Sequence, residues 1–118
     1  MVSLTIVVAD DDEQLLMTLA QLLRLCGHVV HTARDGNEAL AICRATQPDT
    51  ALLDIDMPGL SGWEVAQMLS ADAGPRCRLV ALSGRGSAED RTRSQAAGFD
   101  AHCVKPAEPA ELLRLLSA

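Results

Sequence analysis

Five side chains that could take part in chemistry each stand at the end of a short apolar stretch of the sequence. They are two adjacent carboxylates, a third carboxylate, a hydroxyl and an amine, namely Asp10, Asp11, Asp54, Ser83 and Lys105. Carboxylates at close quarters repel one another, and a hard divalent cation such as Mg²⁺ relieves that repulsion by binding their oxygens. With such a cation, the carboxylate of Asp54 could attack phosphorus and form an acyl phosphate. Lys105 would then neutralise charge on the phosphoryl group, and Ser83 would donate a hydrogen bond to one of its oxygens.

Each of these side chains also has an ordinary structural interpretation. An aspartate that follows a strand often caps the next helix or is solvated in a loop. Lys105 could form a surface ion pair, and Ser83 could simply end a strand. The neighbouring Asp12 could either join the acidic pair or serve as a first-turn acid of the following helix. Several complementary groups at equivalent positions favour a shared site over separate structural roles.

The apolar stretches and the segments between them predict five strands that alternate with five helices. The predicted strands are 4–9, 28–33, 51–54, 77–83 and 99–104. The predicted helices are 15–26, 35–43, 61–69, 87–97 and 109–116, and the third begins with a Ser-x-x-Glu capping box at Ser61 and Glu64. The helix predicted at 87–97 has only alanines for an apolar face, so we expect it to be weakly held on the core.

Five strand-helix units in tandem predict an α/β domain with a doubly wound, five-stranded parallel sheet and helices on both faces. Right-handed crossovers place the carboxyl ends of all the strands at one edge of the sheet. Ligands bind at that edge in open α/β sheets. The predicted fold would therefore gather the reactive side chains, which are far apart in sequence, at a single place.

The composition limits the classes of protein to which the chain can belong. Its 118 residues fit one domain, 1–118. The formal charge of −6 argues against direct binding to nucleic acid or to an anionic membrane, since phosphate contacts need a basic face. No apolar stretch approaches the roughly 20 residues of a membrane span and no secretory signal is visible, so we expect a cytoplasmic protein. Four single cysteines without a Cys-x-x-Cys pair are expected to be reduced thiols.

The ordered motifs resemble the receiver domain of two-component response regulators, and the resemblance covers essentially the whole chain. It rests on the acidic pair after the first strand, the segment 54–62, the strand-end Ser83 and the dipeptide Lys105-Pro106. The resemblance implies a flavodoxin-like sheet with strand order 2-1-3-4-5. It also implies that Asp54 accepts a phosphoryl group from a histidine kinase or a histidine phosphotransfer protein. The chain would not be an enzyme in the usual sense, because it would catalyse only its own phosphoryl transfer and dephosphorylation.

The same resemblance implies roles for individual residues around Asp54. Asp11 would bind Mg²⁺ directly, Asp10 mainly through water, and Asp56 through its backbone carbonyl. Lys105 would contact the phosphoryl group, and the peptide bond before Pro106 would be cis, a geometry that proline makes readily accessible.

The switch position departs from the family pattern. Receivers usually carry Tyr or Phe three residues before the lysine, where the aromatic side chain swings inward when the hydroxyl of the fourth strand moves. Here that residue is His102, which leaves the usual aromatic switch in doubt. The resemblance implies that Ser83 moves toward the phosphoryl group and alters a signalling surface formed by the fourth helix, the fifth strand and the fifth helix.

The segments 79–84 and 97–106 look most like receivers attached to hybrid sensor kinases, so both a stand-alone receiver and a domain of a longer protein remain open. Two other functions also remain as alternatives. The first is a receiver-like protein-binding module that phosphorylation does not regulate. The second is a phosphatase with an aspartyl nucleophile, whose Asp-x-Asp pattern matches Asp54 and Asp56. Phosphatases of that type continue with Gly-Thr after the second aspartate, whereas Met57 and Pro58 follow here.

Overall fold

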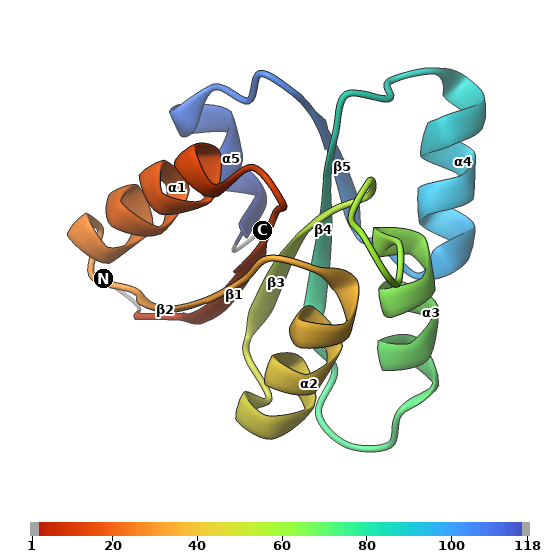
Figure 1. The fold of residues 1–118 in the computed structure, drawn as a ribbon, viewed down its shortest axis with the longest axis horizontal. Coiled ribbons are helices and arrows are strands. Elements are labelled where there is room, and N and C mark those ends of the chain that lie inside the picture. The colour runs from red at the N-terminus through yellow and green to blue at the C-terminus, as the bar shows by residue number, and fades with distance from the viewer. Residues whose placement is uncertain (1–2, 117–118) are drawn as a thin grey trace.

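The computed structural model describes residues 3–116, in which five strands alternate with five helices (Figure 1). The elements are β1 (Thr5–Ala9), α1 (Glu13–Leu25), β2 (Val29–Ala33), α2 (Gly36–Thr46), β3 (Thr50–Asp54), α3 (Gly62–Ala71), β4 (Arg78–Ser83), α4 (Ala88–Ala97), β5 (Ala101–Val104) and α5 (Pro109–Leu116). Residues 1–2 and 117–118 of the predicted domain lie outside the described residues. No helix within residues 3–116 is both long and apolar enough to cross a membrane.

All five strands are parallel and lie in the order β2-β1-β3-β4-β5, which confirms the predicted sheet. The order places β1 and β3 side by side, with Ala9 paired to Leu53 at their carboxyl ends. It places β4 on the other side of β3, with Leu82 paired to Asp54. The strand ends that carry the acidic residues and Ser83 are therefore neighbours.

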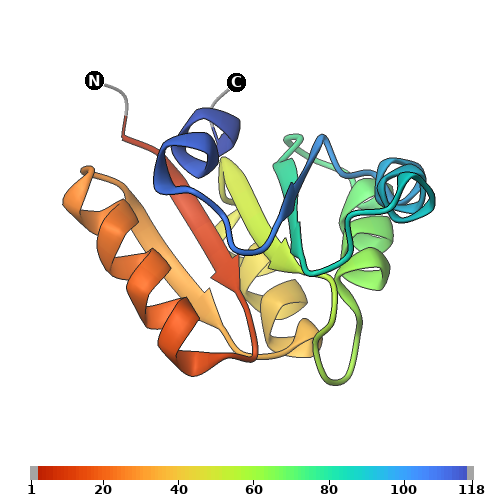
Figure 2. The same cartoon turned by 90° about the horizontal axis from the view of Figure 1, so that it is seen from above.

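The sheet is covered on both faces (Figures 1 and 2). Helices α1 and α5 lie on one face, and helices α2, α3 and α4 lie on the other. Successive residues of β1 face opposite layers, so that Ile6 and Val8 pack under α1 while Val7 points to the α2 side. Because helices cover both faces of the sheet, a strand such as β3 is buried along its whole length.

The fifth strand begins later than the sequence predicts, at Ala101 instead of residue 99. The reason is the way α4 ends. Gly98 has a φ of 110°, and the amide of Phe99 donates to the carbonyl of Ser94, so these residues close the helix. Phe99 is buried in the α2–α3–α4 layer without being part of a strand.

Helix α4 has little contact with the core, as its composition predicts. Ser94 and Ala97 are its buried residues. A hydroxyl thus occupies one of the two inward positions of α4, and its hydrogen bonds matter for how the helix is held.

Candidate functional site

Three carboxylates converge at the carboxyl edge of the sheet and form what we call the acidic pocket, namely Asp10, Asp11 and Asp54. One oxygen from each lies within 4.8 Å of the others. Asp10 has no exposed surface, Asp54 is 3 % exposed, and Asp11 is exposed. Two of them are oriented by local backbone amides, since Asp10 Oδ1 accepts from Asp12 N at 2.9 Å and Asp54 Oδ1 accepts from Asp56 N at 3.1 Å.

Asp12 is not a member of the acidic pocket. It is the N-cap of α1, and its side chain accepts a hydrogen bond from Leu15 N at 3.2 Å. The structure therefore supports a role of Asp12 at the start of α1 and not a role in the acidic pocket.

Lys105 points into the acidic pocket from the end of β5. Its Nζ lies 2.8 Å from Asp10 Oδ2 and 3.4 Å from Asp54 Oδ2. The main chain is held there because Lys105 N donates to the carbonyl of Ser83 at 2.8 Å, and the peptide bond to Pro106 is cis. The ion pair is not a surface pair, since the carboxylate of Asp10 is fully buried.

Ser83 ends β4 and is completely buried. It follows Leu82, the register partner of Asp54, and therefore stands just beyond Asp54 on the neighbouring strand. Its Oγ accepts a hydrogen bond from Arg85 N at 2.9 Å. This bond uses a lone pair of the oxygen and leaves the hydroxyl hydrogen able to donate.

The loop after Asp54 depends on two glycines whose backbones approach other segments closely. Gly62 N donates to the carbonyl of Ile55 at 2.9 Å, and a Cβ on Gly62 would lie 2.5 Å from the backbone oxygen of Asp54. A Cβ on Gly36, at the start of α2, would clash with the backbone oxygen of Leu60. Larger residues at either position would push the loop away, and α3 starts directly from this loop with the predicted Ser61–Glu64 capping box.

Burial and like charge dominate the electrostatics of the acidic pocket. Desolvation, and then the negative charge of Asp10, raise the pKa of Asp54 to about 6 even though Lys105 opposes this shift. Burial alone would lower the pKa of Lys105, but its close contact with Asp10 and the negative charges of Asp54 and Asp10 raise that pKa overall. Lys105 is therefore charged at neutral pH.

The acidic pocket has the ligand atoms that a hard divalent cation requires. All three side chains offer carboxylate oxygens, which is the donor set of Mg²⁺ and Ca²⁺. Within residues 3–116, Asp10 Oδ2 is buried and has no hydrogen bond of good geometry, although Lys105 lies near it. A buried carboxylate oxygen in that situation favours an additional positive charge, so the residues fit a metal ion.

The side chains of Asp56 and His102 are not among the three that form the acidic pocket. The carboxylate of Asp56 is half exposed and forms an ion pair with Arg85 at 3.0 Å. His102 Nδ1 lies 2.9 Å from Ser94 Oγ, and its Nε2 lies 2.6 Å from the carbonyl of Arg85. His102 therefore contacts the β4–α4 loop directly.

Sequence reasoning missed two residues in this region. Arg85 is one, and its position two residues after Ser83 in a short Gly-Arg-Gly loop was the available signal. Ser94 is the other, since its Oγ also accepts from Trp63 Nε1 at 2.9 Å. No sequence pattern pairs residues in different helices in this way.

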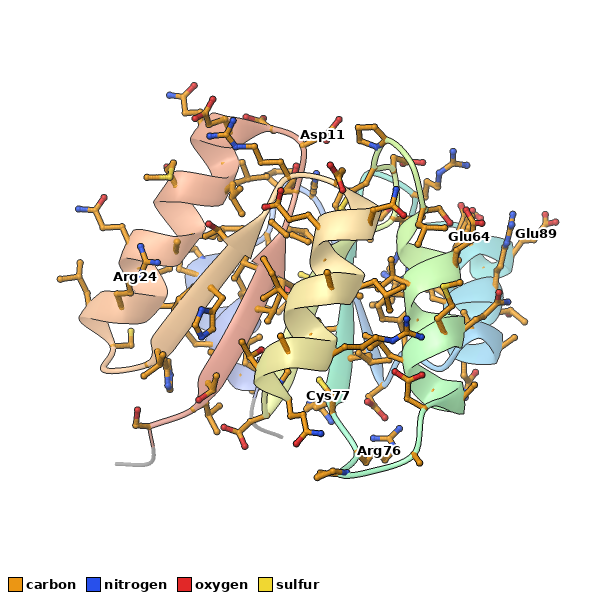
Figure 3. All side chains as sticks on the ribbon, turned by 60° about the horizontal axis from the view of Figure 1, so that its bottom comes forward. Asp11, Arg24, Glu64, Arg76, Cys77 and Glu89 are labelled. Atoms are coloured by element: carbon orange, nitrogen blue, oxygen red, sulfur yellow. The ribbon has the colours of Figure 1, made fainter. Side chains whose placement is uncertain are left out.

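A hollow of about 690 Å³ lies at the opposite edge of the sheet. Figure 3 shows Arg76 and Cys77, two of its lining residues, at the end of the molecule away from Asp11. Its arginines are already paired, Arg44 with Asp72 and Arg76 with Asp100. Its cysteines are free thiols, and burial raises the pKa of Cys43 to about 12 and that of Cys77 to about 11, which makes both thiols unreactive.

Comparison with known proteins gives relatives along nearly the whole chain. The model of the response regulator receiver domain family matches residues 6–117. The transcriptional regulatory protein PrrA of Mycobacterium leprae is 43% identical over 115 residues, which are 96% of this chain and 48% of the relative. The DNA-binding response regulator MtrA of Mycolicibacterium smegmatis is 34% identical, over 96% of this chain and 49% of its own. The chain therefore spans about half the length of these curated relatives.

A solved structure with the same fold is that of the chemotaxis response regulator CheY4 of Vibrio cholerae. It superposes with a TM-score of 0.89 at 26% identity, over 98% of this chain and 100% of the other. The strand order and the covering helices described above are thus those of a known receiver.

Two expectations from the sequence find no support in these comparisons. The curated relatives named above are regulators, so the expected likeness to receivers of hybrid kinases is not shown. MtrA is named a DNA-binding protein, so the absence of a nucleic-acid partner, which we expected from the net charge, is not supported either. Charge describes this stretch of chain, whereas a binding function can reside in other parts of a longer protein. What the matched residues, the identity to PrrA and the shared fold do establish is that this chain belongs to the response regulator receiver domain family.

Proposed function

We propose that Asp54 accepts a phosphoryl group from a phosphohistidine of a histidine kinase or a histidine phosphotransfer protein, and that this modification switches a surface bound by a downstream effector. The observation that carries the proposal is the setting of Asp54, a nearly buried carboxylate with the charged amine of Lys105 at 3.4 Å and two further carboxylates beside it. A structural aspartate has no need of this arrangement.

The chemical step transfers a phosphoryl group from an imidazole nitrogen of the donor histidine to a carboxylate oxygen of Asp54. An oxygen of the ionised Asp54 attacks phosphorus, the phosphorus–nitrogen bond to the donor imidazole breaks, and that imidazole leaves with the bonding electrons and takes up a proton. Lys105 stabilises charge on the moving phosphoryl oxygens. Ser83 donates its free hydroxyl hydrogen to one of them. Because the pKa of Asp54 is raised only to about 6, the nucleophile is mostly ionised at neutral pH.

We assign Mg²⁺ to the acidic pocket, held by Asp10, Asp11 and Asp54 together with the backbone carbonyl of Asp56. The full burial of the Asp10 carboxylate and the all-oxygen donor set support this assignment. When bound, the ion would neutralise charge on the carboxylates and on the phosphoryl oxygens. The protein residues hold and orient these groups, since Asp54 is fixed by Asp56 N and Lys105 by the strand end of β5.

The output would pass through the surface formed by α4, β5 and α5. Ser83 is bonded to the β4–α4 loop, and α4 is thinly attached to the core, so this side of the molecule is the one that a movement of Ser83 can reach. The naming of PrrA and MtrA as regulators of transcription or DNA-binding proteins supports an effector that acts on DNA within a longer protein or complex. In this proposal the chain is not an enzyme acting on other substrates.

The deciding experiment is intact mass after incubation with acetyl phosphate. We expect a gain of one phosphoryl group, ~80 Da, that requires Mg²⁺ and is abolished by EDTA and by Asp54→Asn. Asp12→Asn is the matched control, because asparagine caps a helix as well as aspartate and Asp12 lies outside the acidic pocket.

A folded protein that gains no mass and binds no beryllofluoride in the presence of Mg²⁺ would overturn the proposal in favour of a binding module without phosphorylation. Repeated turnover of a small phosphate ester would favour the phosphatase alternative instead. Binding of beryllofluoride without a gain in mass would show a phosphoryl site whose acyl phosphate hydrolyses quickly.

A further inference from the structure

A chain of hydrogen bonds begins at Ser83 and passes through the main chain of one residue, Arg85. The amide of Arg85 donates to Ser83 Oγ at 2.9 Å. The carbonyl of the same residue lies 2.6 Å from His102 Nε2. The peptide segment at Arg85 is therefore tied to Ser83 on one side and to the switch position on the other.

The chain continues through a buried hydroxyl on α4. His102 Nδ1 lies 2.9 Å from Ser94 Oγ, and Trp63 Nε1 donates to the same oxygen at 2.9 Å. Ser94 is 1 % exposed, and its hydrogen bond with Trp63 is buried, whereas its hydrogen bond with His102 is partly buried. Three elements, α3, α4 and β5, meet at this hydroxyl.

The directions of these bonds follow from the groups themselves. A carbonyl can only accept, so His102 Nε2 carries the hydrogen that faces Arg85. In a neutral ring Nδ1 is then an acceptor, and the hydrogen of Ser94 Oγ must donate to it. The indole of Trp63 can only donate, and it uses a lone pair of Ser94 Oγ. Every polar group in the chain is satisfied in one arrangement, and a change at one end disturbs the others.

We propose that His102 and Ser94 form a hydrogen-bonded relay that carries the phosphorylation state of Asp54 from Ser83 to α4 and Trp63, in place of the swing of an aromatic side chain. The proposal rests on the proposed function, since it describes how that same site would be read out. Ser94 is a positioning residue in it, because it holds His102 and does not contact the acidic pocket.

The relay can respond to phosphorylation because the hydroxyl of Ser83 can donate one hydrogen bond and accept another at the same time. The hydroxyl hydrogen can donate to a phosphoryl oxygen while a lone pair still accepts from Arg85 N. A displacement of Ser83 toward the phosphoryl group thus shifts the peptide at Arg85, and with it the carbonyl that holds His102. His102 must follow or lose this bond, and in either case its bond to the buried Ser94 changes.

The relay also reaches the molecular surface. His102 and Ser94 line a hollow of about 350 Å³ between α4 and β5, together with Arg91 and Gln95. Arg91 Nη1 donates to the carbonyl of His102 at 3.4 Å. A shift of the imidazole would therefore reshape the hollow on the side of the molecule where we place the output.

The relay can be tested on the wild-type protein by side-chain nuclear magnetic resonance with Mg²⁺ and beryllofluoride at fixed pH. Fluorine spectra report whether beryllofluoride is bound. Nitrogen spectra report the ring atoms of His102 and the indole N–H of Trp63. We expect both His102 and Trp63 signals to shift when beryllofluoride binds. Bound beryllofluoride without any shift of His102 and Trp63 would overturn the relay and leave the proposed function intact, whereas an absence of bound beryllofluoride would instead count against the proposed function.

Two matched variants on α4 test the role of Ser94. Ser94→Ala removes the central hydroxyl, and Thr92→Ala removes a hydroxyl that only bonds the carbonyl of Ala88 within the helix. We expect Ser94→Ala to keep beryllofluoride binding and to lose the coupled response at Trp63, while Thr92→Ala responds as the wild type does. Ser94→Thr, which retains a hydroxyl, should restore the response. A full Trp63 response in a folded Ser94→Ala protein would overturn the proposal.

Discussion

The Nζ of Lys105 lies 2.8 Å from Oδ2 of Asp10, a carboxylate with no exposed surface. The two residues come from opposite ends of the chain and from strands that do not neighbour each other in the sheet. Lys105 is the only lysine of the sequence, so no other lysine can replace its charge at this edge.

Replacing Lys105 by alanine should destabilise the protein when no metal is present. The change leaves the carboxylates of Asp10 and Asp54 without their cation, and we expect the free energy of unfolding to fall by about 2 to 4 kcal/mol. Urea denaturation in EDTA measures this. Arg34→Ala is the control, because the ion pair of Arg34 with Glu13 is largely exposed and should contribute less than about 1 kcal/mol. Equal losses in the two variants would contradict the buried pairing.

Replacing Asp54 by asparagine should stabilise the metal-free protein at neutral pH. The folded state raises the pKa of Asp54 from 3.8 to about 6, so ionising this group opposes folding. The penalty is absent below about pH 4, grows as the pH rises toward 6 and is complete above it. We expect the free energy of unfolding of Asp54→Asn to exceed that of the wild type by about 1 to 3 kcal/mol at pH 7.5. The two values should agree near pH 4. Denaturation in EDTA at several pH values tests this, and a variant less stable than the wild type at pH 7.5 would be inconsistent with the electrostatics described.

Mg²⁺ should reverse that order of stability. A ligand that binds only the folded state stabilises it by about 2.7 kcal/mol at a concentration of roughly 100 times its Kd. We expect the melting temperature of the wild type to rise with Mg²⁺, and that of Asp11→Asn and Asp54→Asn to respond much less. Asp12→Asn should respond like the wild type, because Asp12 caps α1. A similar rise in all four proteins would show that the ion does not bind in the acidic pocket.

Phosphorylation should slow amide hydrogen exchange in residues 84–97. These residues form the loop after Ser83 and the whole of α4, which buries only two of its side chains and should open easily in the unmodified protein. A bond between Ser83 and the phosphoryl group would tie down the start of this loop. Exchange followed by mass spectrometry, with and without beryllofluoride, measures the change. Helix α2 serves as the internal reference, and unchanged protection in 84–97 would argue against signalling through α4.

The sequence by itself determined the class of fold and which residues are candidates for the site. Apolar stretches of strand length, capping residues and glycines are local signals, and they placed all five strands and five helices to within a few residues. Parallel strands share one carboxyl edge, so the meeting of Asp10, Asp54 and Ser83 could be expected from strand ends alone. The strand order and the roles of single residues came from the resemblance to receivers, because periodicity does not say which strands are neighbours.

Only the tertiary structure decided how these groups are paired. It assigned Asp12 to the cap of α1 and directed Lys105 at a fully buried Asp10, and these outcomes depend on side-chain directions that composition does not encode. The raised pKa of Asp54 arises from burial and from Asp10, both of which exist only after folding. The meeting of Trp63, His102 and Ser94 at one hydroxyl joins residues up to 39 positions apart in sequence, and it follows from the packing of α3, α4 and β5 against one another. Contacts of this kind carry no local signal, since each partner taken alone is an ordinary helix or strand residue.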